Sequence, residues 1–184
     1  MKTNKIFTTV FILVLFFSCG NKPKQGQETE IALANEKFAE LGIDKLQIKD
    51  LPLIDSTSFD NYGFANKLNQ TQIQALKLNG RFNDVSDFYL NYRINLSENV
   101  ISLVISYQKG EYELFTVLIN YDDDYNIIDT LDIAYDEIAE SLSRIISTVQ
   151  TDKILVERFN YMEDESVSEI SVYNIDTLGV FQMK

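Results

Sequence analysis

The chain has 184 residues and a formal net charge of −12, and its 45% of apolar residues suffices for one packed domain. A protein this acidic repels nucleic acids and anionic lipid, because binding either depends on lysines and arginines that displace counterions. It contains no histidine and one cysteine, which removes the usual general base near neutral pH, the serine triad and the commonest zinc ligand. We therefore expect no nucleic-acid partner, no cofactor and no catalytic residue of these kinds.

The N-terminus has the layout of a secretion leader. Met1–Lys5 is short and basic, and Ile6–Phe17 is an apolar run below the roughly 20 residues that span a bilayer. The stretch Leu15–Cys19 resembles the lipobox of bacterial lipoproteins, with the small Ser18 before the cysteine. The resemblance implies cleavage before Cys19 and acylation of this residue, which is the predicted lipidation site. An uncleaved anchor helix or an ordinary signal peptide with an incidental cysteine is the alternative.

We therefore divide the chain into a signal peptide over residues 1–18, a flexible polar tether over 19–29 and one globular domain over 30–184. The acyl chains that the resemblance implies would attach the protein stably to a membrane, because one chain holds weakly and two or more hold stably. No acidic cluster directly follows Cys19, and in some Gram-negative groups such a cluster marks lipoproteins for the outer surface. We expect a periplasm-facing location at the outer membrane, with surface exposure left open.

Two helices are expected before the sheet. Ile31–Leu41 carries apolar residues at helical spacing, and Gly42 follows as a C-terminal stop. Its apolar face would pack on the domain or, alternatively, bind a partner. Leu46–Ile54 contains a proline and is expected to be an extended connection. The second helix is expected to begin at a capping box over Thr71–Gln74 and to end at Gly80.

From about residue 86 the apolar period changes to two, which is typical of strands. The first strand is expected to bury Phe88, Leu90, Tyr92, Ile94 and Leu96 on one face. The expected strands are Phe88–Leu96, Val100–Tyr107, Glu111–Tyr121, Tyr125–Tyr135, Leu142–Val149, Lys153–Asn160, Val167–Ile175 and Val180–Met183. Their connections are short and join antiparallel neighbours, because a parallel crossover needs a dozen or more residues.

We therefore predict a mainly β (α+β) domain. It is an antiparallel meander of about seven or eight strands over residues 86–184, either a twisted open sheet or a partial barrel. Residues 30–85 are helical or irregular, and one or two N-terminal helices pack on the sheet. The stretch Leu114–Ile133, an acidic turn followed by an Ile-Ile-Asp strand, also resembles a type of bacterial envelope lipoprotein without an established activity. This resemblance implies a fold type and a location, and no chemistry.

The turn after the third strand has the most site-like cluster. Asp122, Asp124 and Asn126 have the alternate spacing that opens a calcium loop. Ile127 stands where that loop needs glycine, and Ile133 stands where it needs an acid. Acidic residues are common in hairpin turns for backbone reasons. We therefore interpret the cluster as a turn, with a metal site as the weaker alternative.

Two acids interrupt the next strand. Asp129 and Asp132 have opposite parity and point to opposite faces, so they cannot form a catalytic pair by themselves. Asp129 lies on an apolar face, and we expect a structural role for it. Five tyrosines at strand ends form a possible binding surface for a sugar or a protein, or are half-buried strand residues with solvated hydroxyls: Tyr107, Tyr112, Tyr121, Tyr125 and Tyr135.

The main functional hypothesis is an envelope-anchored, non-enzymatic binding or accessory protein that contacts a protein or a glycan through a sheet face or its loops. It rests on the anchor, the tether and a compact β domain without catalytic signatures. An inhibitor or immunity lipoprotein is a variant of this hypothesis. A carboxylate-based glycan hydrolase is the alternative, and it requires two acids that converge in one cleft. A structural spacer without a ligand is a third possibility.

Overall fold

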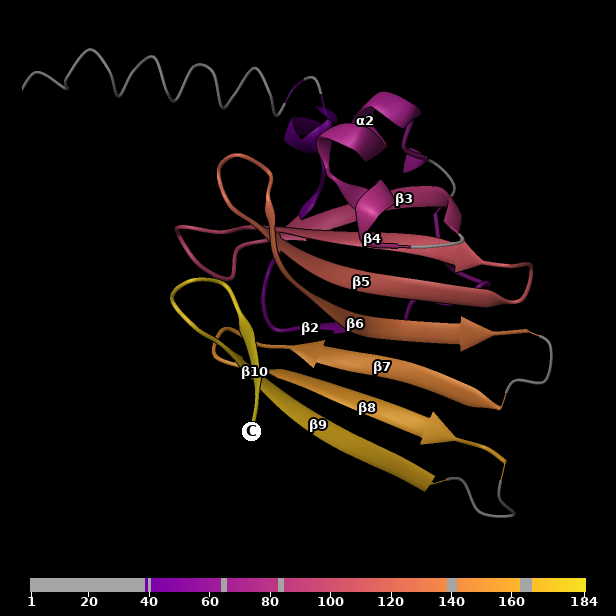
Figure 1. Cartoon of the computed structure of the whole chain (residues 1–184). Helices are drawn as coiled ribbons and strands as arrows, with labels where there is room; N and C mark the ends of the chain where they lie inside the picture. The colour runs from indigo at the N-terminus through magenta and orange to yellow at the C-terminus, as the bar shows by residue number, and fades with distance from the viewer. Residues whose placement is uncertain (1–38, 40, 64–65, 83–84, 139–141, 163–166) are drawn as a thin grey trace, which may run out of the picture.

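The computed structural model describes residues 39, 41–63, 66–82, 85–138, 142–162 and 167–184, which form one open β-sheet with short helices (Figure 1). The strands are β1 (Ile48–Lys49), β2 (Leu53–Asp55), β3 (Val85–Ile94), β4 (Ile101–Lys109), β5 (Glu113–Tyr121), β6 (Ile127–Glu137), β7 (Ser143–Val149), β8 (Ile154–Asn160), β9 (Val167–Ile175) and β10 (Phe181–Met183). The sheet order is β1-β3-β4-β5-β6-β7-β8-β9-β10, and β2 also pairs with β7. The prediction of a mainly β, largely antiparallel domain is confirmed.

The sheet has ten strands, where seven or eight are predicted. Strands β3 to β10 lie next to one another in chain order, as their short connections predict. The two additional strands, β1 and β2, lie in or at the end of Leu46–Ile54, which is predicted as an extended connection. β1 pairs with β3 in parallel, so the sheet is mixed, and β2 pairs with β7. Both strands are too short for a period-two pattern and pair with strands distant in sequence, so no local signal reveals them.

β2 fills a gap between β6 and β7. β8 pairs with β7 from Ser143 to Val149 along one edge. On the other edge, β6 meets β7 at Ile145, and β2 pairs with residues 147–149. Successive side chains of a strand alternate between faces. Leu53 packs into the core while Ile54 points outward and is exposed.

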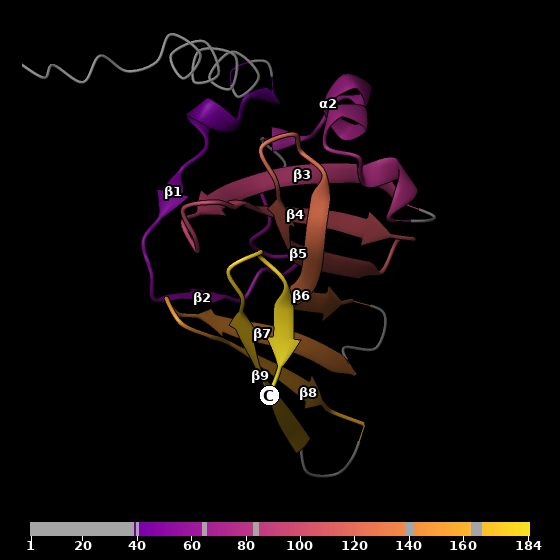
Figure 2. The same cartoon turned by 60° about the vertical axis from the view of Figure 1, so that its left-hand side comes forward.

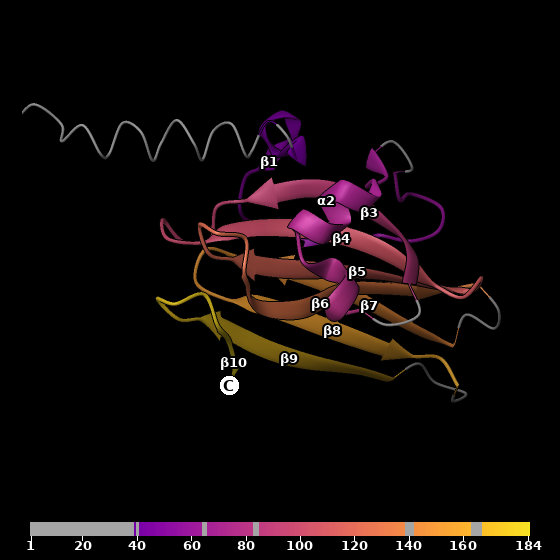
Figure 3. The same cartoon turned by 45° about the horizontal axis from the view of Figure 1, so that its top comes forward.

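The helical elements are η1 (Ile43–Lys45), α2 (Gln70–Ala75) and η3 (Leu78–Gly80). Figure 3 shows α2 over β3 to β5 and away from β8 and β9. The residues of these helices that are buried pack with β3, β4 and β5 and with the turn after β5. The helix expected over Ile31–Leu41 lies outside the described residues, apart from Ala39 and Leu41.

The N-terminal cap of α2 lies two residues before the expected one. The Gln72 backbone N–H donates to Asn69 Oδ1 at 2.9 Å, and the Asn69 N–H donates to Gln72 Oε1 at 2.9 Å. The predicted capping box over Thr71–Gln74 is therefore wrong, because Asn69 and Gln72 have the same spacing and asparagine is the stronger cap. The predicted end at Gly80 is also wrong, since Lys77 adopts a left-handed conformation and interrupts the helix.

Two hydrophobic clusters lie on opposite faces of the central strands. Leu103 and Ile119 belong to the cluster under the helices, whereas Val104 and Leu118 belong to the second cluster. Adjacent residues of a strand point to opposite faces, so β4 and β5 are buried on both. The second cluster also contains buried residues of β6, β7 and β8: Leu131, Ile133, Val149, Ile154 and Val156.

Register shifts in β3 change which of its residues face each cluster. The alternation predicts one buried face, but Phe88 and Leu90 pack with the helices, whereas Tyr92 and Ile94 pack in the second cluster. A shift between Leu90 and Tyr92 in the pairing with β4 separates the two sets. A bulge inserts one residue into a strand and thereby moves the following side chains to the other face. Tyr89 lies between Phe88 and Leu90 and is buried because it packs with Tyr62 and Leu114 in a third, smaller cluster.

The C-terminal hairpin folds back onto the sheet. Figure 2 shows β10 in front of β7 and β9 and close to β6. Asn120 Nδ2 donates to the Gly179 carbonyl at 2.8 Å, and the Phe181 N–H donates to Asp129 Oδ2 at 2.9 Å. Asp129 therefore has a structural contact, which fastens β10 to β6.

Candidate functional site

The five tyrosines that the sequence singles out do not form one exposed surface. Tyr107, Tyr121, Tyr125 and Tyr135 are buried, because their rings fill the cluster under the helices or pack on its edge. Tyr121 donates its hydroxyl proton to the Leu76 carbonyl at 3.2 Å. Burial raises the pKa of Tyr125 to about 12, against the opposing effect of a nearby arginine. Tyr112 is 53% exposed and is the one member of this set that a partner could contact.

The acidic turn is held together by its own side chains. Asp122 Oδ1 accepts the N–H groups of Asp124 and Asn126 at 2.9 and 2.8 Å, and its Oδ2 accepts Asn126 Nδ2 at 2.8 Å. The side-chain hydrogen bond from Asn126 is the main cause that lowers the pKa of the Asp122 carboxyl. Lys77 Nζ donates to Asn126 Oδ1. Both carboxylate oxygens of Asp122 and the side-chain oxygen of Asn126 thus accept hydrogen bonds from the protein itself.

Two glutamates converge on one tyrosine hydroxyl. Tyr135 Oη lies 3.0 Å from Glu113 Oε1 and 2.9 Å from Glu137 Oε2. The other oxygen of Glu137 accepts the N–H groups of Leu142 and Ser143 at 2.6 and 3.0 Å. Glu137 thus binds the backbone at the start of β7. We interpret Glu113 and Glu137 as residues that stabilise the fold, and not as the acid and nucleophile of a hydrolase.

Asp132 is a partly buried acid in the middle of β6. Burial raises the pKa of its carboxyl, and the nearby Arg158 opposes this shift. The register places Asp132 opposite Val117 and Asp129 opposite Asn120. The two aspartates lie on opposite faces, as the sequence predicts, and cannot act on one bond.

On the side of β7, β8 and β9 away from the second cluster, the described residues leave an apolar surface uncovered, which we call the outer face. It consists of Ile54, Ile146, Leu155, Phe159, Ile170 and Val172. Ile54 and Ile170 are 69% and 56% exposed, and the other four are half-buried. Among the described residues, none of the three hydrophobic clusters includes a member of this set.

The strand register arranges these residues in rows. Ile146, Glu157 and Ile170 lie opposite one another across β7, β8 and β9. Leu155 lies between Thr148 and Val172 in the next row, which Ile54 extends through its pairing with Thr148. Directly opposed side chains in neighbouring strands lie about 5 Å apart. The outer face therefore extends across four strands, and its apolar residues lie around Thr148 and Glu157.

An aromatic pair borders the outer face. Phe159 stacks on the exposed Tyr161, with ring centroids 6.1 Å apart and planes 4° from parallel. Tyr161 also lines a hollow of about 440 Å³. Within this hollow, Asp136 Oδ2 accepts the Phe59 N–H at 2.9 Å. The hollow is lined by Phe59, Asp60, Asp136, Glu137, Ile138, Ser143, Arg144 and Tyr161.

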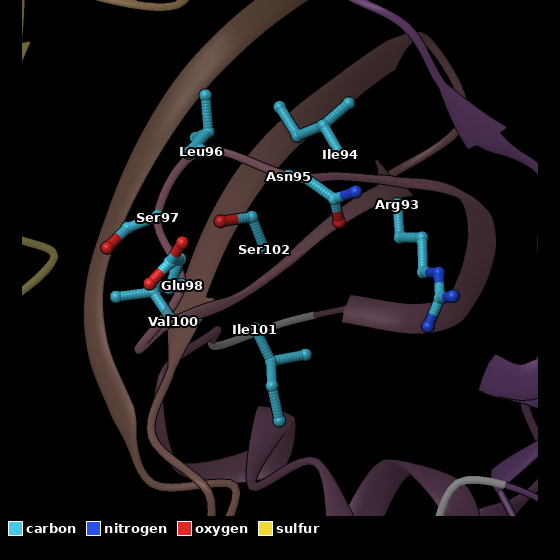
Figure 4. A pocket seen from close by; sticks show the side chains of 9 residues that line it. All are labelled: Arg93, Ile94, Asn95, Leu96, Ser97, Glu98, Val100, Ile101 and Ser102. Atoms are coloured by element: carbon cyan, nitrogen blue, oxygen red, sulfur yellow. The ribbon is translucent and has the colours of Figure 1, made fainter.

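A second hollow, of about 450 Å³, lies within the connection between β3 and β4. In Figure 4, the side chains of Arg93 and Glu98 lie on opposite sides of it, and Asn95 and Ser102 lie between them. Ser102 donates to Asn120 Oδ1 at 2.7 Å within the core. The whole lining comes from residues 93–102, so one hairpin forms this hollow and no distant chemical groups converge in it.

The comparisons identify no relative. No protein-family model matches the chain, and no curated protein and no solved structure matches it. Over the described residues, no three Asp, Glu, His or Cys side chains gather as they would to hold a metal ion. In the same part of the chain, no helix has the length and apolar character to cross a membrane. The outer face is the candidate functional site because it exposes large apolar side chains such as Ile54 and Ile170.

The sequence also contains a pattern that indicates the outer face, and it is a continuous apolar run and not an alternating one. β8 begins with Ile154, Leu155 and Val156, which are apolar on both faces. Such a run predicts a strand covered on both sides. In the structure Ile154 and Val156 are buried and Leu155 faces outward. β8 is thus apolar on both faces, but the described chain covers only one of them, and the other belongs to the outer face.

Proposed function

We propose that this chain is a lipid-anchored protein of the bacterial cell envelope that binds a partner protein through its outer face. The observation that carries the proposal is the uncovered apolar surface across β2, β7, β8 and β9. Contiguous exposed apolar patches are uncommon on proteins that act alone and often mark interaction sites. Attachment through Cys19 is the sequence-based part of the proposal.

The chemistry of the outer face favours a protein over a glycan. Glycan sites rely on exposed aromatic rings with polar groups around them, and most tyrosines of this chain are buried. The outer face is mainly aliphatic, with Phe159 at its border. Aliphatic side chains gain free energy by excluding water from an apolar partner surface, at about 25 cal/mol per Å².

Photo-crosslinking in the native membrane tests the binding surface. A photoreactive residue at Ile146 in the lipidated chain is expected to form a discrete adduct with one protein. Leu155→Lys should abolish this adduct, because it places a charge at the centre of the contact. A photoreactive residue at the exposed Gln74 on α2 is the matched control and should give no adduct. An adduct at Ile146 that survives Leu155→Lys would contradict the proposal.

The anchor has a separate test. Cys19→Ala should fold normally, because Cys19 is the only cysteine and no disulfide depends on it. The variant should lose labelling by radioactive palmitate and should leave the membrane fraction. Retention in that fraction, with an unchanged distribution, would show that Cys19 is not the anchor.

A further inference from the structure

Beyond its pairing with β10, the edge of β9 has no strand beside it among the residues that the structure describes. β10 pairs with residues 173–175 of β9, and the Lys184 N–H donates to the Val172 carbonyl at 2.9 Å. In an antiparallel pair, backbone groups point alternately to the two sides of a strand. Because Val172 points toward β10, Ile170 and Ser168 direct their N–H and C=O groups to the same side. In the described chain, no strand lies there.

The opposite end of the sheet is closed in several ways. β1 pairs with β3 at Arg93 and Ile94. Further along β3, the Leu68 N–H donates to the Phe88 carbonyl at 2.8 Å, and Lys67 forms a bridge with Tyr89. Proteins commonly block a sheet edge that must stay unpaired. The first half of β9 has no such cover among the described residues.

We propose that an extended segment of a different protein adds to the sheet as a strand beside Ser168 and Ile170. This inference rests on the proposed function, because it states how the partner meets the border of the outer face. Strand addition takes affinity from main-chain hydrogen bonds and specificity from alternate side chains. The added strand would place apolar side chains beside Ile170 and Val172, in continuity with the outer face.

Charge decides what kind of segment fits. Glu169 is exposed and points to the face opposite Ile170, where the alternate side chains of an added strand would lie. Arg158 lies opposite Glu169 in the register but donates to Ser171 Oγ at 3.2 Å. In the sequence, the acidic triplet Glu163-Asp164-Glu165 comes shortly before β9, and the whole chain carries −12. These charges oppose a second copy of this chain and favour a basic partner. The fitting segment alternates apolar residues with lysine or arginine.

A synthetic peptide that alternates lysine and valine tests the inference. Added at millimolar concentration to the purified full chain, it should slow hydrogen exchange at the Ser168 and Ile170 amides. Ile170→Pro should weaken binding by about tenfold or more, because it removes one outward N–H. Ile170→Thr keeps this N–H and should weaken binding much less. A peptide that alternates glutamate and valine should bind about tenfold more weakly than the lysine peptide.

Four results would overturn the inference. One is equal binding to wild type and Ile170→Pro, and another is equal affinity for the two peptides. The third is concentration-dependent self-association that Ile170→Pro removes, which would make a second copy the occupant. The fourth is a lysine peptide that does not bind while the Ile146 crosslink persists; the strand addition would then be wrong and the proposed function would stand. Slow hydrogen exchange at the β8 amides shows that Ile170→Pro is folded. If this variant does not fold, Ser168→Pro is used in its place.

Discussion

Replacing Gly179 with alanine tests the turn that holds β10 against the sheet. Gly179 has a φ of +88°, which side chains rarely adopt. A Cβ at this position would lie 2.9 and 3.3 Å from the two γ-carbons of Val100 and 3.4 Å from Ile128 Cδ1. The left-handed conformation costs about 1–2 kcal/mol, and overpacking a buried contact costs about 1–3 kcal/mol. We expect Gly179→Ala to lower the free energy of unfolding by about 3 kcal/mol.

Gly110 is the matched control for this substitution. Its φ is +67°, and no atom lies within 4 Å of a Cβ built there, so Gly110→Ala should cost only the backbone term of about 1–2 kcal/mol. Urea unfolding followed by far-ultraviolet circular dichroism measures both losses. Val100→Ala combined with Gly179→Ala should recover part of the steric cost, and a double-mutant cycle gives the coupling. Equal losses for Gly179→Ala and Gly110→Ala would refute the steric reasoning.

Three further predictions concern other junctions of the fold. Asn69→Ala should lower the free energy of urea unfolding by about 1 kcal/mol through loss of the α2 cap, whereas Thr71→Ala should change it little. Asp129→Ala should lower it by about 1–3 kcal/mol and speed hydrogen exchange at the Phe181 amide, because that N–H loses a charged acceptor; unchanged exchange would contradict the contact. Burial raises the pKa of Asp132 in the folded state, so its contribution to stability falls as pH rises above the unfolded value of about 4. Asp132→Asn should therefore reduce the decline in melting temperature above this pH, and an unchanged pH profile would contradict the raised pKa.

The sequence predicts the C-terminal half of the fold closely because its signals there are local. Val167–Ile175 matches β9 at both ends. The tight turn at Thr151-Asp152 joins β7 and β8, and the Gln150 N–H donates to the Lys153 carbonyl at 2.9 Å. Alternation and turn residues act over a few positions, so they identify hairpins reliably. The predicted strand at Tyr125–Tyr135 begins two residues early, because Tyr125 adopts a left-handed conformation in the turn.

The features that the sequence does not reveal depend on contacts between distant segments. β2 pairs with β7 about ninety residues later in the chain, and no local pattern encodes this pairing. The bulges of β3 change its buried face without changing its composition. The candidate site is of the same kind, because Leu155 and Ile170 are apolar in the sequence whether or not another layer covers them. Only the arrangement of the strands shows that the described chain leaves this face uncovered.

Accessibility of the outer face in the cell tests the central claim most directly. The chain has no cysteine other than Cys19, so a thiol introduced by Ile54→Cys or by the control Gln74→Cys can be labelled with a small maleimide that crosses the outer membrane. We predict that Ile54→Cys reacts readily in the purified protein and is protected in intact cells, because a partner covers it there. Gln74→Cys should react in both. Equal labelling of Ile54→Cys in cells and in the purified protein would contradict a partner bound at the outer face.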